Sequence, residues 1–138
     1  MSESIPPEGE LDHDADEQVM EFAHSICRWI AENHPDVEIV MDDDDYAVSA
    51  DKQRYTRQAF VATNLGRVLI IPDFVNTSSA AMVINMGVVS AMIKEGFTHE
   101  QIAEEGRIYS NPIPYTPSGV EVLGYYLTHH MNITGAAE

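Results

Sequence analysis

The amino-acid sequence predicts an α+β fold: an N-terminal helix, an antiparallel β-meander of three to four strands, and then three helices packed on one face of the sheet. Apolar residues recur at helical spacing from residue 17, β-rich segments fill residues 37–71, and helical patterns return after residue 77. Helices that are segregated from strands along the chain are typical of α+β folds. The length of 138 residues suits one domain.

The chain begins with an acidic segment, residues 1–16, that has almost no apolar side chain to bury, so we expect a disordered arm. We place a single α+β domain at residues 17–134 and a flexible tail at residues 135–138. The domain starts with an amphipathic helix that ends near His34, because Pro35 disfavours helical geometry in the residue before it. The apolar side chains of this helix recur three and four residues apart: Val19, Phe22, Ala23, Ile26 and Ile30.

The first strands flank a run of four aspartates. Residues 37–41 predict one strand and residues 46–49 a second, shorter one. Residues 42–45 between them predict an acidic turn.

A β-hairpin is predicted next. Residues 57–63 and 67–71 flank a short connection that contains Gly66, which can adopt the positive φ that such turns require. Residues 68–71 are apolar on both faces, so we expect a central strand that is covered on each side or lies at a subunit contact.

Residues 77–94 are apolar nearly all round a helical period, so we predict that they form the most buried helix, capped by Thr77 or Ser78 and ended by Gly96. The β-branched residues of this segment leave a strand at residues 82–89 as the alternative.

Two further helices complete the predicted fold. Thr98 and Gln101 have the spacing of a capping box, which predicts a short helix to about residue 105. Thr116 followed by Pro117 begins a last helix through about residue 131.

The charge and composition of the chain restrict the classes of partner that it can bind. Twenty-three acidic residues against seven Lys and Arg give a net charge of −16, and no window holds the basic cluster that nucleic-acid binding requires, so we expect no direct contact with nucleic acid. We expect no membrane span, because no segment approaches the length of about 20 apolar residues that a span requires. The single Cys27 and the lack of a signal-peptide pattern favour the cytoplasm.

From the sequence we assign no catalytic residue, no metal site and no cofactor. Residues 42–45 are consecutive aspartates without the alternating ligands, central Gly and terminal Glu of an EF-hand loop. Glu21 and His24 form one carboxylate–imidazole pair, whereas a di-iron bundle needs two such pairs. Cys27 lies beside the apolar stripe of its helix, where a thiol is inert.

The leading hypothesis is a non-catalytic protein that acts by binding another protein, as an inhibitor, adaptor or small chaperone. The order of helix, strands and helices in a short acidic chain resembles the layout of small dimeric secretion chaperones. The acidic residues that we expect to bind the partner lie in the arm and in the predicted turn: Asp12, Asp14, Asp16, Asp42, Asp43, Asp44 and Asp45. A homodimer is expected because residues 68–71 and 82–93 offer more apolar surface than one thin layer buries.

Two alternatives stay open. One is a nucleic-acid mimic, whose clustered carboxylates would block a DNA-binding protein. The other is a small enzyme with a site of scattered polar residues, for which the candidates are Asp73, His99, Tyr109 and Tyr115.

Overall fold

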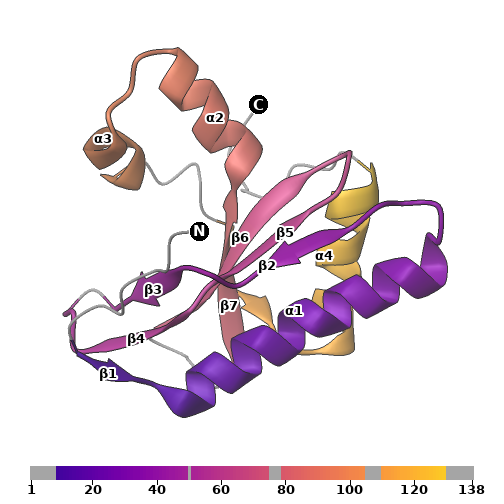
Figure 1. Ribbon diagram of the computed structural model, residues 1–138, viewed down its shortest axis with the longest axis horizontal. Helices are drawn as coiled ribbons and strands as arrows, with labels where there is room; N and C mark the ends of the chain where they lie inside the picture. Colours follow the sequence, from indigo (N-terminus) through magenta and orange to yellow (C-terminus); the bar gives the residue numbers. More distant parts are fainter. Residues whose placement is uncertain (1–8, 50, 75–78, 105–109, 130–138) are drawn as a thin grey trace.

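The computed structural model describes residues 9–49, 51–74, 79–104 and 110–129 (Figure 1). The helices and strands of this part of the chain follow in this order: β1 (Glu10–Leu11), α1 (His13–Asn33), β2 (Val40–Asp42), β3 (Tyr46–Val48), β4 (Arg54–Arg57), β5 (Ala59–Ala62), β6 (Arg67–Pro72), β7 (Ala80–Asn85), α2 (Met86–Lys94), α3 (His99–Glu104), β8 (Ile113–Pro114) and α4 (Pro117–His129).

The strands form two sheets. A five-stranded antiparallel sheet has the order β2-β5-β6-β7-β8, and a three-stranded sheet has the order β1-β4-β3. Gln58 alone separates β4 from β5, so one nearly continuous stretch of chain contributes a strand to each of the two sheets. The α+β class is therefore confirmed, with more strands than the predicted three to four.

The ordered chain begins earlier than predicted. β1 pairs in parallel with β4, and Asp12 caps α1 by accepting a hydrogen bond from the backbone N–H of Ala15 at 3.2 Å. The helix therefore starts at His13, inside the segment that was expected to be disordered up to residue 16. Residues 1–8 and the predicted tail at 135–138 lie outside the described residues.

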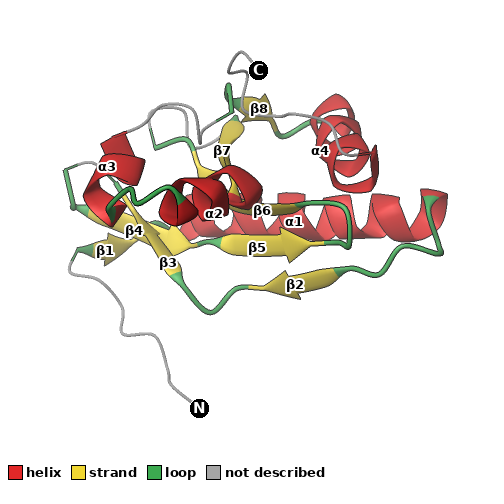
Figure 2. Cartoon of the chain, turned by 90° about the horizontal axis from the view of Figure 1, so that it is seen from above, coloured by secondary structure: helices red, strands yellow, loops and turns green. Residues whose placement is uncertain are grey.

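The main core lies between the five-stranded sheet and two helices, α1 and α4, which cover the same face (Figure 2). On α1 the predicted apolar stripe is buried, and α4 contributes Leu123 and Leu127. The sheet residues of this core alternate along their strands, as expected where one face is buried more deeply than the other: Ala59, Val61, Val68, Ile70, Ala81 and Val83.

The predicted hairpin and central strand are confirmed. β5 and β6 pair in antiparallel register, with Phe60 opposite Leu69, and β6 lies in the middle of the sheet. Val68 and Ile70 are fully buried beneath α1, whereas Leu69 and Ile71 are half-buried on the other face.

The helix predicted at residues 77–94 is wrong in its first half. β7 (Ala80–Asn85) is a strand that pairs with β6, and the central strand needs this second neighbour to satisfy its backbone groups. The helix α2 begins only at Met86, because the side chain of Asn85 accepts hydrogen bonds from the N–H groups of Gly87 and Val88. The predicted caps Thr77 and Ser78 lie outside the described residues.

The expected packing of three helices on one face is also wrong. Neighbouring residues of a strand point to opposite faces, and while Val83 faces α1 and α4, Ile84 packs against α2 and α3 in a separate small core (Figure 1). Met92 is the buried residue of α2, so this helix is not the most buried one.

The later boundaries agree well with the sequence. Gly96 has a positive φ of 96° after α2, and Thr98 and Gln101 form the reciprocal hydrogen bonds of a capping box. The hydroxyl of Thr116 accepts the N–H of Gly119, and α4 starts at Pro117 as expected. No helix in the described part of the chain is both long and apolar enough to cross a membrane.

The closest approach of α1 and α4 depends on a glycine. A Cβ atom added at Gly124 of α4 would overlap the indole ring of Trp29 on α1. The ring therefore lies directly on the helix backbone, and it also contacts Tyr125 with ring centroids 5.6 Å apart.

Substitution Gly124→Ala should push Trp29 away from α4 and lower the free energy of unfolding by about 1–3 kcal/mol, the usual range for overpacking. Urea unfolding and the emission wavelength of Trp29, the single tryptophan of the chain, measure both effects. Ser118→Ala, at an exposed position of the same helix, is the control. A Gly124→Ala protein with unchanged stability and emission would contradict this packing.

Candidate functional site

Two of the predicted partner-binding aspartates are engaged inside the molecule. Asp12 caps α1 and also forms a salt bridge with Arg54 at 2.9 Å. Asp16 is buried, and both of its carboxylate oxygens receive hydrogen bonds from Arg57, which contributes its backbone N–H as well as its guanidinium. Asp14, in contrast, is exposed on the first turn of α1.

Arg57 also holds the acidic run. Its NH1 donates to the carboxylate of Asp43 at 3.0 Å, so one guanidinium joins Asp16 of α1 to the segment after β2. Burial raises the pKa of Asp16, but the hydrogen bonds and positive charge of Arg57 outweigh this effect and leave the pKa below its ordinary value.

The acidic run is not the predicted turn between paired strands. β2 pairs with β5, and β3 pairs with β4. Because β4 and β5 are nearly continuous in the chain, β2 and β3 follow one another along the same edge of that stretch (Figure 1). Asp42 lies opposite Phe60 and Tyr46 opposite Arg57, so that residues 43–45 face residues 58–59. Three residues on this side therefore stand opposite two on the other, as in a β-bulge, and we call residues 42–45 the acidic bulge.

Within this bulge Asp42, Asp44 and Asp45 are exposed. Carboxylate oxygens of Asp42, Asp43 and Asp44 lie within 4.8 Å of one another, and the hydrogen bond and negative charge of Asp42 raise the pKa of Asp44. Because Arg57 already neutralises Asp43, and the other two carboxylates are solvated, we assign no metal ion to this cluster.

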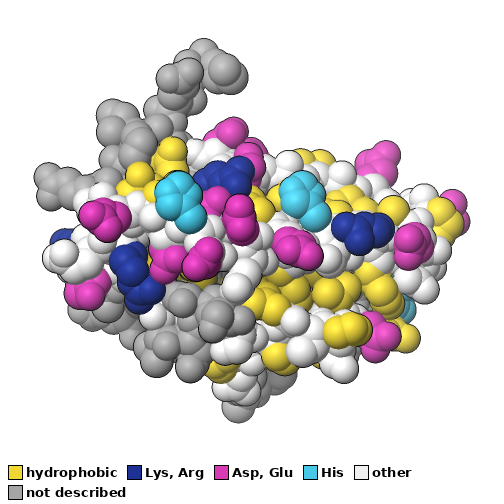
Figure 3. Space-filling model, turned by 90° about the horizontal axis from the view of Figure 1, so that it is seen from below, with side chains coloured by type: hydrophobic (Ala, Val, Ile, Leu, Met, Phe, Trp, Pro, Cys, Tyr) yellow, Lys and Arg dark blue, Asp and Glu magenta, His cyan; other side chains and the backbone are white. Residues whose placement is uncertain are grey.

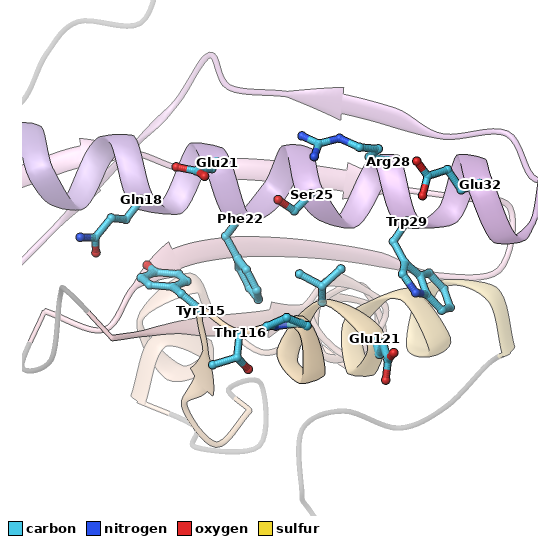
Figure 4. Close-up of a pocket in the computed structure, with 12 residues that line it drawn as sticks. Gln18, Glu21, Phe22, Ser25, Arg28, Trp29, Glu32, Tyr115, Thr116 and Glu121 are labelled. Carbon is cyan, nitrogen blue, oxygen red and sulfur yellow. The ribbon is translucent and has the colours of Figure 1, made fainter.

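A groove of about 580 Å³ lies between α1 and the start of α4 (Figure 4). Its residues come from two ends of the chain: Gln18, Glu21, Phe22, Ser25, Arg28, Trp29 and Glu32 from α1, and Tyr115, Thr116, Pro117, Val120 and Glu121 from the segment that begins α4.

The floor of the groove is aromatic. Phe22 and Trp29 point from α1 toward α4 (Figure 4), and the ring of Phe22 meets that of Tyr115 edge to face with centroids 5.1 Å apart. On α4, Val122 and Tyr125 are exposed to 52% and 48%, and the ring of Tyr125 contacts that of Trp29. Apolar side chains therefore gather beside the band of charged side chains on this face (Figure 3).

The rim of the groove is mainly acidic. Glu21 and Glu32 lie along α1 and Glu121 lies across the groove on α4, against the single positive charge of Arg28. Among the residues that the structure describes, these four side chains form no salt bridge.

Among the described residues, the hydroxyl oxygen of Tyr115 and the side-chain oxygen of Gln18 are buried beside the aromatic floor without a hydrogen-bond partner. Burial, together with the negative charge of Asp73, raises the pKa of Tyr115. The hydroxyl thus stays protonated at neutral pH and acts there as an uncharged group.

The scattered residues considered for an enzyme are not gathered in this groove. Tyr115 lines it, but His99 lies on α3, across the sheet from α1 (Figure 1). Tyr109 lies outside the described residues. Burial raises the pKa of the Cys27 thiol, so its nucleophilic thiolate form is disfavoured.

Comparison of the chain with protein-family models, with curated proteins and with solved structures finds no match.

Sequence reasoning missed the groove because its two walls lie far apart in the chain. The available signal was Trp29, which flanks the apolar stripe of α1 and is too large for a purely solvated position. What the sequence could not indicate is that Tyr115 and Val120 lie opposite it.

The Arg57–Asp16 contact predicts an acid-side loss of stability. A carboxyl whose pKa is lowered by folding stabilises the protein above its unfolded pKa, and this contribution is lost as the pH falls through the folded pKa, below about pH 4. Asp16→Asn should lower the free energy of unfolding by about 2 kcal/mol at neutral pH and flatten its decline in acid.

Urea unfolding between neutral and acidic pH measures this effect, with Asp14→Asn as the matched control on the same helical turn. Equal behaviour of the two variants would show that the buried pair does not stabilise the fold.

Tyr115→Phe removes a buried hydroxyl that has no partner, so it should raise the free energy of unfolding by up to about 1 kcal/mol at neutral pH. Because folding raises the pKa of Tyr115, the wild type should lose stability as the pH rises above about 10, and the variant should lose less. Part of the loss persists, since burial also raises the pKa of Tyr126.

Chemical unfolding at neutral and alkaline pH tests this prediction, with Tyr125→Phe as the exposed control. A clear loss of stability in Tyr115→Phe at neutral pH would mean that the hydroxyl has a partner in solution.

Proposed function

We propose that this protein is a non-catalytic binding module that holds an apolar segment of another protein in the groove between α1 and α4. The observation that carries the proposal is an aromatic floor inside a polar rim, in which the rings of Trp29 and Tyr115 are half-buried and the ring of Phe22 is buried. Binding sites between proteins are typically built this way, with aromatic anchors at the centre and polar groups around them.

The chemistry of the groove supports binding over catalysis. Its polar groups are three solvated glutamates, one arginine and uncharged side chains, and the Tyr115 hydroxyl is held in its neutral form. A nucleophile beside a positioned base is what hydrolytic or transfer chemistry would need, and among the described residues the hydroxyls of Ser25 and Thr116 form no hydrogen bond with a carboxylate of the groove.

The exposed aspartates contribute to this proposal by attracting the partner. Asp14, Asp42, Asp44 and Asp45 are exposed and, with the net charge of −16, would attract a positively charged partner over some distance. A nucleic-acid mimic is less well supported, because Asp12, Asp16 and Asp43 pair with arginines of the same chain and are not free to imitate phosphates.

Affinity capture from the native host with matched variants tests the groove. Val120→Gln places a polar amide on the groove without changing charge, whereas Val48→Gln makes the same change at an exposed position on β3. We expect captured partners to fall at least about tenfold with Val120→Gln and to stay unchanged with Val48→Gln, since an amide in place of an apolar contact in the groove costs about 1–2 kcal/mol of binding free energy.

Both variants must first give the unfolding midpoint of the wild type, so that a loss of partners is not a loss of fold. Equal capture by wild type and Val120→Gln would contradict the proposal.

A further inference from the structure

We propose that the occupant of the groove is an amphipathic helix that carries Lys or Arg on both flanks of its apolar face. This inference rests on the proposed function and names the chemistry of the partner. The groove is bounded by two helices, and a third helix that lays an apolar stripe between them follows the usual packing of ridges into grooves.

The side chains that α1 contributes to the groove recur with the period of a helix, so the side chains of a partner helix can pack between them. On α1 the floor residues Gln18, Phe22 and Trp29 form one stripe at four- and seven-residue spacing, and Glu21, Arg28 and Glu32 form the stripe beside it at seven- and four-residue spacing. Figure 4 shows the first stripe turned toward α4 and the second along the outer edge of α1.

The charges select a cationic partner. Glu21 and Glu32 are about three helical turns apart, or about 16 Å, and Glu121 adds a further negative charge on α4. A bound helix would place cations near both ends of its contact with α1 and one toward α4. Opposite Arg28, which lies between the two glutamates on α1, a neutral residue fits best.

The same charges argue against other occupants. A second copy of this chain would bring another net charge of −16 to a rim that is already acidic, and an acidic segment would meet the same repulsion. Lys and Arg can also lay their aliphatic stems over the half-buried rings of Trp29 and Tyr115 while their charged ends reach the rim, and their cations are attracted by aromatic faces.

The test uses a designed helical peptide of about 18 residues, long enough to span about 27 Å. It carries a Leu stripe, flanking Lys residues and no Tyr or Trp. A matched peptide has the same Leu stripe and Glu in place of every Lys. Because Trp29 is the single tryptophan and lies in the groove, its emission reports occupancy of this site directly.

We expect the Lys peptide to shift the emission of Trp29 to shorter wavelength and to bind at least about tenfold more tightly than the Glu peptide at low salt. The difference should shrink at high salt, because the rim charges are exposed and screened. The double variant Glu21→Lys, Glu32→Lys should lose the preference for the Lys peptide. Glu100→Lys makes the same kind of substitution on α3, away from the groove, and should keep this preference.

Equal binding of the two peptides, or no shift of Trp29 with either, overturns the cationic inference. The proposed function fails separately, when Val120→Gln leaves the captured partners unchanged. A wild-type dimer that Val120→Gln dissociates would identify a second copy as the occupant and would also overturn the inference.

Discussion

The contact of Trp29 with the backbone of Gly124 is the constraint on which the arrangement of α1 and α4 depends. Both helices cover the same face of the sheet, and the indole can lie on α4 only because position 124 has no side chain. The two helices are thus in direct contact at Trp29, while nearer the start of α4 the rings of Phe22 and Tyr115 form the floor of a groove. Trp29 therefore belongs both to this helix contact and to the lining of the groove.

A second constraint is electrostatic and organises the acidic half of the molecule. Arg57 binds Asp16 and Asp43 together, so it ties the start of α1 to the bulge between β2 and β3. The strongly acidic composition therefore has two roles. Some carboxylates, such as Asp12 and Asp16, hold elements together, and others, such as Asp42 and Asp44, remain on the surface with a field that favours positively charged partners.

The sequence predicted correctly those elements that depend on residues close to one another in the chain. The apolar stripe from Val19 to Ile30, the hairpin at Gly66 and the capping box at Thr98 are set by nearby residues, and each is found where it was expected. The strand Ala80–Asn85 was misassigned because its composition also suits a helix, and pairing with β6 decides the outcome. The acidic bulge and the groove depend on partners distant in the chain, such as Arg57 with Asp16 and Val120 with Trp29, which no local pattern reveals.

The central claim is that another protein occupies the groove between α1 and α4. Site-specific photo-crosslinking in the native host tests it most directly, with the photoreactive residue placed at Val120 in the groove or at Val48 on β3. The account predicts a discrete covalent adduct from position 120 whose captured peptide is a basic amphipathic helix, and no such adduct from position 48. Identical products from both positions, or none from position 120, would contradict it.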